Sequence, residues 1–291
     1  MSHPARADAD DEKKVGAVRE TWEVVKTVVY ALLIALVIRT LFLQPYTIPS
    51  ASEEPNLYRG DYIIVSKWSY GYSHHSILFS PPLFRGRIFF TPPRRGDIIV
   101  FKLPRDGHTD YIKRLVGLPG DTIQMRGGQL YINGKAVAEH PVPVDRTHVH
   151  DESEPVVWVR ETNPEGRSYI TQRLTFSGGA NNTGVYVVRP HCYFMMGDNR
   201  DNSADSRFDP GLAPDDPRLG GCGWDSRLDA ALAYQLGVGF VPEENLVGKA
   251  QIVMVSWNTG IDEGDHSKAT IFKPWTWITD LRPDRFLHRL K

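Results

Sequence analysis

Residues 48–57 read Ile-Pro-Ser-Ala-Ser-Glu-Glu-Pro-Asn-Leu and follow the longest apolar run of the chain. The stretch places two hydroxyl groups, Ser50 and Ser52, just beyond the end of that run. Pro and Ser are common in turns, so an ordinary connecting segment has the same composition. A serine hydroxyl becomes a good nucleophile only when a base takes its proton. A catalytic interpretation of Ser52 therefore requires a base elsewhere in the chain.

The apolar run covers residues 24–43 and reads VVKTVVYALLIALVIRTLFL. Its length matches the roughly 20 residues that cross a bilayer as a helix. Lys26 and Arg39 interrupt it near its two ends, where long side chains can reach the headgroups. A cleaved secretory signal peptide is the competing interpretation, but no small-x-small cleavage pattern follows the run. The sequence therefore favours a retained transmembrane anchor over residues 24–43.

Charges beside the anchor predict its orientation. The N-terminal side carries Lys13, Lys14, Arg19 and Lys26. On the other side only Arg59 lies nearby. The positive-inside rule then predicts a cytoplasmic N-terminus and places residues 44–291 outside the cytoplasm. Residues 1–23 are polar and mixed in charge, so we expect a disordered cytoplasmic tail.

Composition excludes several functional classes. The 291 residues are 41% hydrophobic and 24% charged, with a net charge of -1, as in an ordinary globular protein. A basic stripe and a zinc-like Cys/His spacing are both absent from the sequence, so we expect no nucleic-acid partner, no metal and no cofactor. Cys192 and Cys222 could form a disulfide in an oxidising compartment or remain two buried thiols, and the sequence leaves both open.

Two related segments predict buried strands. Residues 59–67 read Arg-Gly-Asp-Tyr-Ile-Ile-Val-Ser-Lys, and residues 95–102 read Arg-Gly-Asp-Ile-Ile-Val-Phe-Lys. In each, a Gly-Asp turn leads into a β-branched run, the pattern of a strand entered through a turn. Between them, residues 74–93 are rich in Pro and Phe and predict a long surface loop.

The sequence after the second repeat predicts further antiparallel strands. Asn133-Gly134 is a strong signal for a two-residue hairpin, because both positions of a type I′ turn require positive φ angles. Alternating segments follow at residues 156–159, 169–176 and 185–188. We therefore expect a mostly β fold, an antiparallel-sheet domain with a β-rich insertion at about residues 122–190, on one N-terminal transmembrane helix.

Two other segments are candidates for the site that Ser52 needs. Lys113 lies in an apolar run and either points to solvent or is buried; burial can lower a lysine pKa enough to make a general base. Residues 197–207, Gly-Asp-Asn-Arg-Asp-Asn-Ser-Ala-Asp-Ser-Arg, directly follow an apolar strand. Such a run suits either a solvated loop or a hydrogen-bonded network that positions a base. His74 and His75 lie in the long loop without a carboxylate neighbour, so a histidine base is less favoured.

Four segments, in order, resemble the pattern of bacterial signal peptidase I, the leader peptidase with a Ser-Lys dyad. They are residues 45–66, 95–121, 193–208 and 239–248. The resemblance implies a membrane-bound serine endopeptidase that removes signal peptides from exported preproteins after small residues. Its partners would be preproteins and membrane lipid. It would span the bacterial inner membrane once, with the catalytic domain in the periplasm or outside the cell.

The same resemblance implies roles for individual residues. Ser52 resembles the nucleophile and Lys113 the general base, while Ser50 resembles the hydroxyl that joins the Ser52 backbone N–H in an oxyanion hole. The supporting residues implied are Ser203, which would orient the lysine, and the ion pair of Asp205 with Arg207. The chemistry is sound on its own terms, because a neutral lysine can take the serine proton and pass it to the leaving amine.

Three departures from the family pattern stand out. Glu53 replaces the usual Met after the nucleophile, and Asn56 replaces the usual Thr. Residues 209–236 form an extra segment, which costs little as a surface loop. Because a carboxylate near the lysine would favour its charged form, the alternative is a catalytically impaired, membrane-anchored peptide-binding homologue. A self-cleaving Ser-Lys repressor would carry a DNA-binding region in place of residues 24–43.

Overall fold

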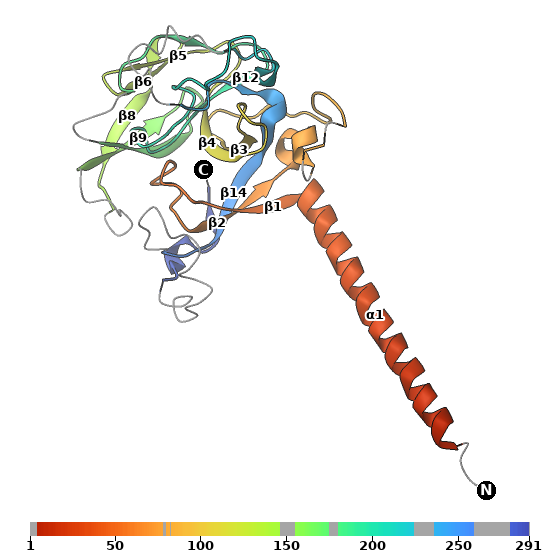
Figure 1. The fold of residues 1–291 in the computed structure, drawn as a ribbon. Coiled ribbons are helices and arrows are strands. Elements are labelled where there is room, and N and C mark those ends of the chain that lie inside the picture. The colour runs from red at the N-terminus through yellow and green to blue at the C-terminus, as the bar shows by residue number, and fades with distance from the viewer. Residues whose placement is uncertain are drawn as a thin grey trace.

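The computed structural model describes residues 5–77, 80–81, 83–145, 155–174, 180–223, 236–258 and 280–290. One helix, α1 (Ala5–Leu41), projects from a β domain, and the chain enters that domain through strand β1 (Figure 1). Within α1, the segment Arg19–Leu41 is long and apolar enough to cross a membrane. None of its most apolar 18 residues is buried against the rest of the protein. These properties fit membrane anchoring.

The bounds of α1 differ from the expected ones. The helix begins at Ala5, so it includes most of the segment that we expected to be disordered. Continuing a formed helix costs much less than starting one, and residues 5–23 contain many Ala, Glu and Lys, which are good helix formers. At the other end the helix stops at Leu41. Pro45 disfavours helical backbone just before it, and the chain becomes strand β1 instead.

The main sheet has eight strands, and every pair in it is antiparallel, as expected. In spatial order seven of them are β1 (Leu43–Thr47), β2 (Asp61–Ser66), β14 (Leu246–Ser256), β3 (Ile98–Lys102), β4 (Asp110–Gly117), β12 (Cys192–Met196) and β13 (Val241–Pro242). Strand β15 (His288–Arg289) pairs with β14. The two sequence repeats are β2 and β3, which lie on either side of β14, so both predicted strands are confirmed.

The repeated Gly-Asp turn starts both strands in the same way. Gly60 and Gly96 each have φ of 86°, a backbone conformation that glycine adopts without strain. The carboxylates of Asp61 and Asp97 each accept a hydrogen bond from the backbone N–H three residues earlier, at 2.9 and 3.0 Å. The turn therefore sets where each strand begins.

The chain between β4 and β12 forms two smaller sheets, on the side of the domain away from α1 (Figure 1). One contains β11 (Tyr186–Val187), β5 (Thr122–Arg126), β6 (Gln129–Ile132) and β7 (Lys135–Ala136). The other contains β10 (Ser168–Leu174), β9 (Val156–Thr162) and β8 (Ala138–Val142). The predicted hairpin is confirmed, because Asn133 and Gly134 have φ of 53° and 73° and join β6 to β7. Of the expected strand over residues 169–176, the last two residues lie outside the described part.

Strand β3 lies at the centre of the core and is buried on both faces. Ile98 and Val100 pack into one apolar cluster, and Ile99 and Phe101 into another, as the alternation of side chains along a strand requires. The first cluster also contains Ile48 and Leu57, the two ends of the stretch around Ser52. Apolar burial at both ends therefore holds that stretch against the sheet.

Cys192, at the start of β12, and Cys222 form a disulfide, which decides between the two alternatives left open above. Both residues are buried in the core cluster that joins the inserted sheet to β12. The bond fastens the extra segment to the main sheet across a sequence separation of 30 residues.

We expect the Cys192→Ser/Cys222→Ser variant to lose about 3 to 4 kcal/mol of unfolding free energy, because the bond restricts the unfolded chain. Denaturant unfolding of the variant and of the oxidised wild type measures this difference. The matched variant Cys192→Ala/Cys222→Ala separates loss of the bond from burial of two hydroxyls. Two free thiols in a mass spectrum of unreduced wild type would contradict the disulfide.

Candidate active site

Ser52 and Lys113 are in direct contact, although 61 residues separate them in sequence. The Nζ atom of Lys113 donates a hydrogen bond to Ser52 Oγ and a second one, of 2.9 Å, to the Ile112 carbonyl. Both side chains are buried, with Ser52 exposed by 8% and Lys113 by 3%. Of the two alternatives given above for Lys113, the structure therefore shows the buried one. Its amine lies within hydrogen-bond distance of the serine hydroxyl, as a base for that hydroxyl must.

Backbone contacts fix the position of Ser52. The N–H of Ile48 donates to the carbonyl of Asp61 at 2.9 Å, which ties the stretch to the start of β2. The backbone N–H of Asn199 donates to the Ser52 carbonyl at 3.1 Å, and its side-chain amide donates to the Ala51 carbonyl at 3.2 Å. Asn199 thus connects the stretch around Ser52 to the polar run that follows β12. Sequence reasoning did not single it out, because nothing local distinguishes it from its polar neighbours.

Two donors suitable for an oxyanion lie beside the Ser52 hydroxyl. Ser50 Oγ is 3.3 Å from Ser52 Oγ. The backbone N–H of Ser52 makes no hydrogen bond within the described residues, so it remains available to a ligand. This arrangement can stabilise negative charge that develops on a carbonyl attacked by Ser52.

Ser203 lies close to Ser52 but does not make the expected contact. Its Oγ is buried and has no hydrogen-bond partner, so the bond to Lys113 that the family pattern implies is absent here. The Ser203 side chain instead packs against the backbone of Gly197. A Cβ atom at Gly197 would lie 2.3 Å from Ser203 Oγ and 2.4 Å from the Ser52 carbonyl oxygen. The site therefore closes around a glycine that has no room for a side chain.

The expected ion pair of Asp205 and Arg207 is present and fully buried. The carboxylate accepts two bonds from the guanidinium, at 2.8 and 2.9 Å, and a third from the Gly197 N–H at 3.0 Å. Burial alone would raise the pKa of Asp205, but the Arg207 charge and these hydrogen bonds outweigh it and hold that pKa below its ordinary value. The pair positions Gly197, and through it the wall beside Ser52.

Glu53 faces the lysine instead of solvent. Its side chain is fully buried, with Oε1 3.7 Å from Lys113 Nζ, and neither carboxyl oxygen has a hydrogen-bond partner. Burial raises the pKa of Glu53 well above its ordinary value, and the nearby Asp198 carboxylate raises it further, while Lys113 and Arg114 oppose the rise. A buried carboxyl without hydrogen bonds is held more easily in its neutral form.

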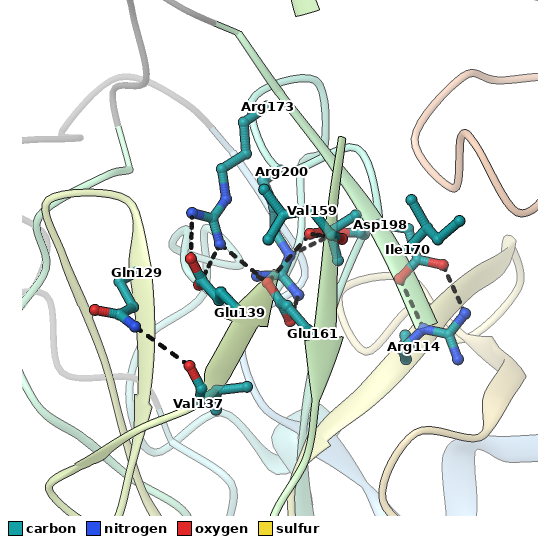
Figure 2. Close-up of polar contacts among 12 residues, drawn as sticks. Arg114, Gln129, Val137, Glu139, Val159, Glu161, Ile170, Arg173, Asp198 and Arg200 are labelled. Atoms are coloured by element: carbon teal, nitrogen blue, oxygen red, sulfur yellow. Dashed lines mark hydrogen bonds and ion pairs between the residues drawn. The ribbon is translucent and has the colours of Figure 1, made fainter. Parts of the chain in front are cut away.

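Asp198 joins three parts of the site. It accepts two hydrogen bonds from Arg114, at 2.7 and 2.8 Å (Figure 2). It accepts another from the amide of Asn56, at 2.7 Å. The same amide group also donates to the Ile170 carbonyl at 2.6 Å. Asn56, a departure from the family pattern, is therefore anchored on both sides. Sequence reasoning missed Arg114, whose only local signal is its position directly after the candidate lysine.

A second ionic network supports the polar run from the far side. Figure 2 shows the Glu161 carboxylate between the guanidinium groups of Arg200 and Arg173. Arg200 donates to it twice at 2.6 Å, and Arg173 once at 3.1 Å. Arg173 also contacts Glu139, at 2.6 Å. The run 197–207 is thus a buried network and not a solvated loop.

The described residues contain no group of three or more His, Cys, Asp or Glu side chains that could hold a metal ion.

The known proteins that are similar to this chain are signal peptidases. A family model described as signal peptidase, peptidase S26, matches residues 21–257. The signal peptidase I of Rickettsia typhi is 37% identical over 270 residues, and that of Rickettsia felis is 36% identical over 274 residues. Each alignment covers 90% of this chain and 90% of the relative. A crystal structure of a signal peptidase I from Enterococcus faecalis V583 is 24% identical, with a TM-score of 0.27, and covers 55% of this chain and 97% of that one.

Proposed function

Because the chain belongs to the signal peptidase family, peptidase S26, we propose that it cleaves signal peptides with Ser52 as nucleophile and Lys113 as general base. Family membership supports cleavage of signal peptides by a serine peptidase. The observation that carries the finer assignment is the buried hydrogen bond between the Lys113 amine and the Ser52 hydroxyl.

The proposed reaction needs only groups already described. A neutral Lys113 amine takes the proton of Ser52 as Oγ attacks the scissile carbonyl, and the backbone N–H of Ser52 and the Ser50 hydroxyl stabilise the resulting oxyanion. The lysine ammonium then gives its proton to the leaving amine, which leaves an acyl ester on Ser52. The neutral lysine then takes a proton from water as the water attacks the ester carbonyl, and the resulting ammonium gives that proton to Ser52 Oγ as the acyl group leaves.

An extended substrate segment could pair with an open strand edge beside the dyad. Strand β12 pairs with β4 only from Arg114 onward, so residues 110–113 pair with β3 alone within the described structure. Strand β1 likewise pairs only with β2 there, and its chain continues to Ser52. We propose that the cleavage segment adds as a strand along these edges and that small pockets select small residues before the cut.

We also propose that α1 crosses the bacterial inner membrane with its N-terminus in the cytoplasm and the β domain outside. The cluster of basic residues before the apolar segment supports this orientation. The disulfide supports it too, because such bonds persist in oxidising compartments such as the periplasm and are rare in the cytosol.

The proposed function is tested by incubating the purified full chain with a preprotein and determining the new N-terminus. Replacing the small residue just before the cut with Leu should lower kcat/KM by at least about 100-fold, the upper end of what one misfitting apolar group costs. The same change one position earlier should cost about tenfold or less. Equal tolerance at the two positions would contradict the pocket model.

Glu53→Gln and Glu53→Met should shift the acid limb of the kcat/KM profile to lower pH. Above its raised pKa the Glu53 carboxyl is ionised, and an ionised carboxylate close to the lysine favours the ammonium, an effect typically worth about 1 to 3 pH units. Removing the carboxyl leaves more neutral amine at each pH, and the acid limb reports the base in the free enzyme.

Glu54→Gln is the matched control. Burial raises the pKa of Glu54 to about 7, and the charges that oppose this rise are arginines, not Lys113. Its substitution should leave the acid limb in place. An unchanged limb in both Glu53 variants would contradict the coupling and mean that Glu53 stays protonated throughout the working range. Cleavage by Glu53→Met alone, with none by wild type at any pH, would establish the impaired peptide-binding homologue.

A further inference from the structure

A cavity of about 350 Å³ lies where α1 meets the β domain. Its walls come from the last turn of α1, strand β1, the β3–β4 hairpin and the loop after β2. The charged side chains that line it are Arg39, Lys67, Lys102 and Asp110. Asp110 lies three residues before Lys113 on β4, and side chains three apart on a strand point to opposite faces. The cavity is therefore separate from the catalytic dyad.

Positive charge in this cavity is only partly neutralised. Asp110 pairs with Lys102 at 2.9 Å. Within the described residues, neither Arg39 nor Lys67 has a carboxylate within ion-pair distance. The cavity therefore presents two cations without an ion-pair partner, Arg39 and Lys67, beside a third, Lys102, that is paired with Asp110.

Lys67 is the most informative of these groups, because it is buried with an exposed fraction of only 3%. Its ammonium donates one hydrogen bond, of 2.6 Å, to the Ser76 carbonyl, although an ammonium has three N–H donors. Burial lowers the pKa of Lys67 to about 8, and the charge of Arg39 lowers it further, while Asp110 opposes the change. Burying a cation without a partner is costly, and an anion in the cavity would offset that cost.

His75 adds an unused polar atom to the same wall. Its Nδ1 is buried and has no hydrogen-bond partner. Burial lowers the pKa of His75 to about 3, and neighbouring cationic groups add to the effect, so the ring is neutral at physiological pH. A neutral imidazole can donate one hydrogen bond without adding charge. The cavity thus offers two cations and a neutral ring to one anionic group.

The cavity lies close to the membrane end of α1. Arg39 is two residues from the end of the membrane-length segment, which places it at the depth of lipid headgroups once α1 spans a bilayer. Phe42 follows three residues later, its ring centroid lies 6.2 Å from that of Trp68, and both rings are about half exposed. Exposed aromatic rings at a helix end are typical of the membrane interface.

We propose that this cavity binds the phosphate of an anionic phospholipid headgroup, with Arg39 and Lys67 as its main ligands. An arginine can hold two phosphate oxygens side by side, and a lysine supplies a compact point charge. The proposal rests on membrane anchoring through α1 and does not depend on the assignment of the dyad.

The test uses the full chain in non-ionic detergent, freed of lipid and titrated calorimetrically with dihexanoyl phosphatidylglycerol. Wild type should bind it, and Arg39→Gln and Lys67→Met should each weaken binding by at least about tenfold, as loss of a charge-assisted contact implies. Lys135→Gln is the matched control, a cation on the exposed strand β7, and should bind like wild type. Equal affinity in wild type and Arg39→Gln would overturn the proposal.

Two further measurements keep the outcome unambiguous. Lys67 is buried, so its variant could disturb the loop it contacts, whereas Arg39 is exposed and its variant should keep the thermal midpoint of wild type. Inorganic phosphate, titrated in parallel, should bind at least about tenfold more weakly than the lipid if the headgroup is the source. If inorganic phosphate bound as tightly as the lipid, the proposal that the anion comes from the membrane would be wrong. Zwitterionic dihexanoyl phosphatidylcholine should bind more weakly than phosphatidylglycerol, and the reverse order would contradict selection for anionic lipid.

Discussion

Lys113→Arg is expected to abolish cleavage, with kcat/KM at least about 1,000-fold below wild type, the scale seen when one member of a catalytic unit is removed. Arginine remains protonated at any workable pH, so it keeps the positive charge but has no free electron pair to accept the Ser52 proton. Lys113→Ala and Ser52→Ala should fail to the same extent. The measurement is the rate at which the new N-terminus appears from a preprotein.

Controls separate chemistry from folding in this prediction. Lys135→Arg makes the same substitution on the exposed strand β7 and should leave the rate unchanged. All three dyad variants should retain cooperative unfolding. Ser50→Ala should retain partial activity, about 100-fold to 1,000-fold below wild type, because one oxyanion donor remains. Cleavage by Lys113→Arg at the wild-type rate would remove the lysine from the mechanism.

Gly197→Ala is expected to have the second largest effect, on both activity and stability. The added methyl group would lie 2.4 Å from the Ser52 carbonyl oxygen and 2.3 Å from Ser203 Oγ, distances that force the backbone apart. Overpacking of this kind typically costs about 1 to 3 kcal/mol. A displacement of about 1 Å at a nucleophile can by itself reduce the rate about 100-fold. Thermal unfolding and kcat/KM measure the two effects.

Two variants at Ser203 identify which contact matters. Gly197→Ala/Ser203→Gly removes the side-chain clash but leaves the clash with the Ser52 carbonyl, so it should restore little activity. Full recovery in this double variant would show that the backbone contact is unimportant. Ser203→Ala alone should cost little stability, since the hydroxyl it removes has no hydrogen-bond partner.

The elements that could be predicted from sequence are those specified by neighbouring residues. The two Gly-Asp repeats encode β2 and β3 because a turn and a β-branched run are both local patterns. The Asn133-Gly134 turn is encoded in two residues by their tolerance of positive φ. Burial of Lys113 was one of two alternatives that the sequence left open, and its contact with Ser52 followed only from resemblance to a family, because no local pattern brings the turn after β1 to strand β4.

Other features depend on tertiary contacts that sequence patterns do not contain. A glutamate in a polar stretch is usually solvated, yet Glu53 is buried because Ile48 and Leu57 pull both ends of its segment into the core. Asn199 is one of several polar residues in its run, and only the fold decides that it contacts the carbonyls of Ala51 and Ser52. The pairing of Cys192 with Cys222 likewise depends on the fold, which brings the two residues together.

The half-paired strand β4 has a consequence for how many different proteins one such enzyme can process. A guest strand bound along residues 110–113 would be held mainly by its amide and carbonyl groups, which every polypeptide carries in the same arrangement. Most of the binding free energy would then not depend on which side chains the substrate carries. A few positions next to the cut would provide the discrimination, so a cell could export a large and varied set of proteins while maintaining a single maturation enzyme for all of them.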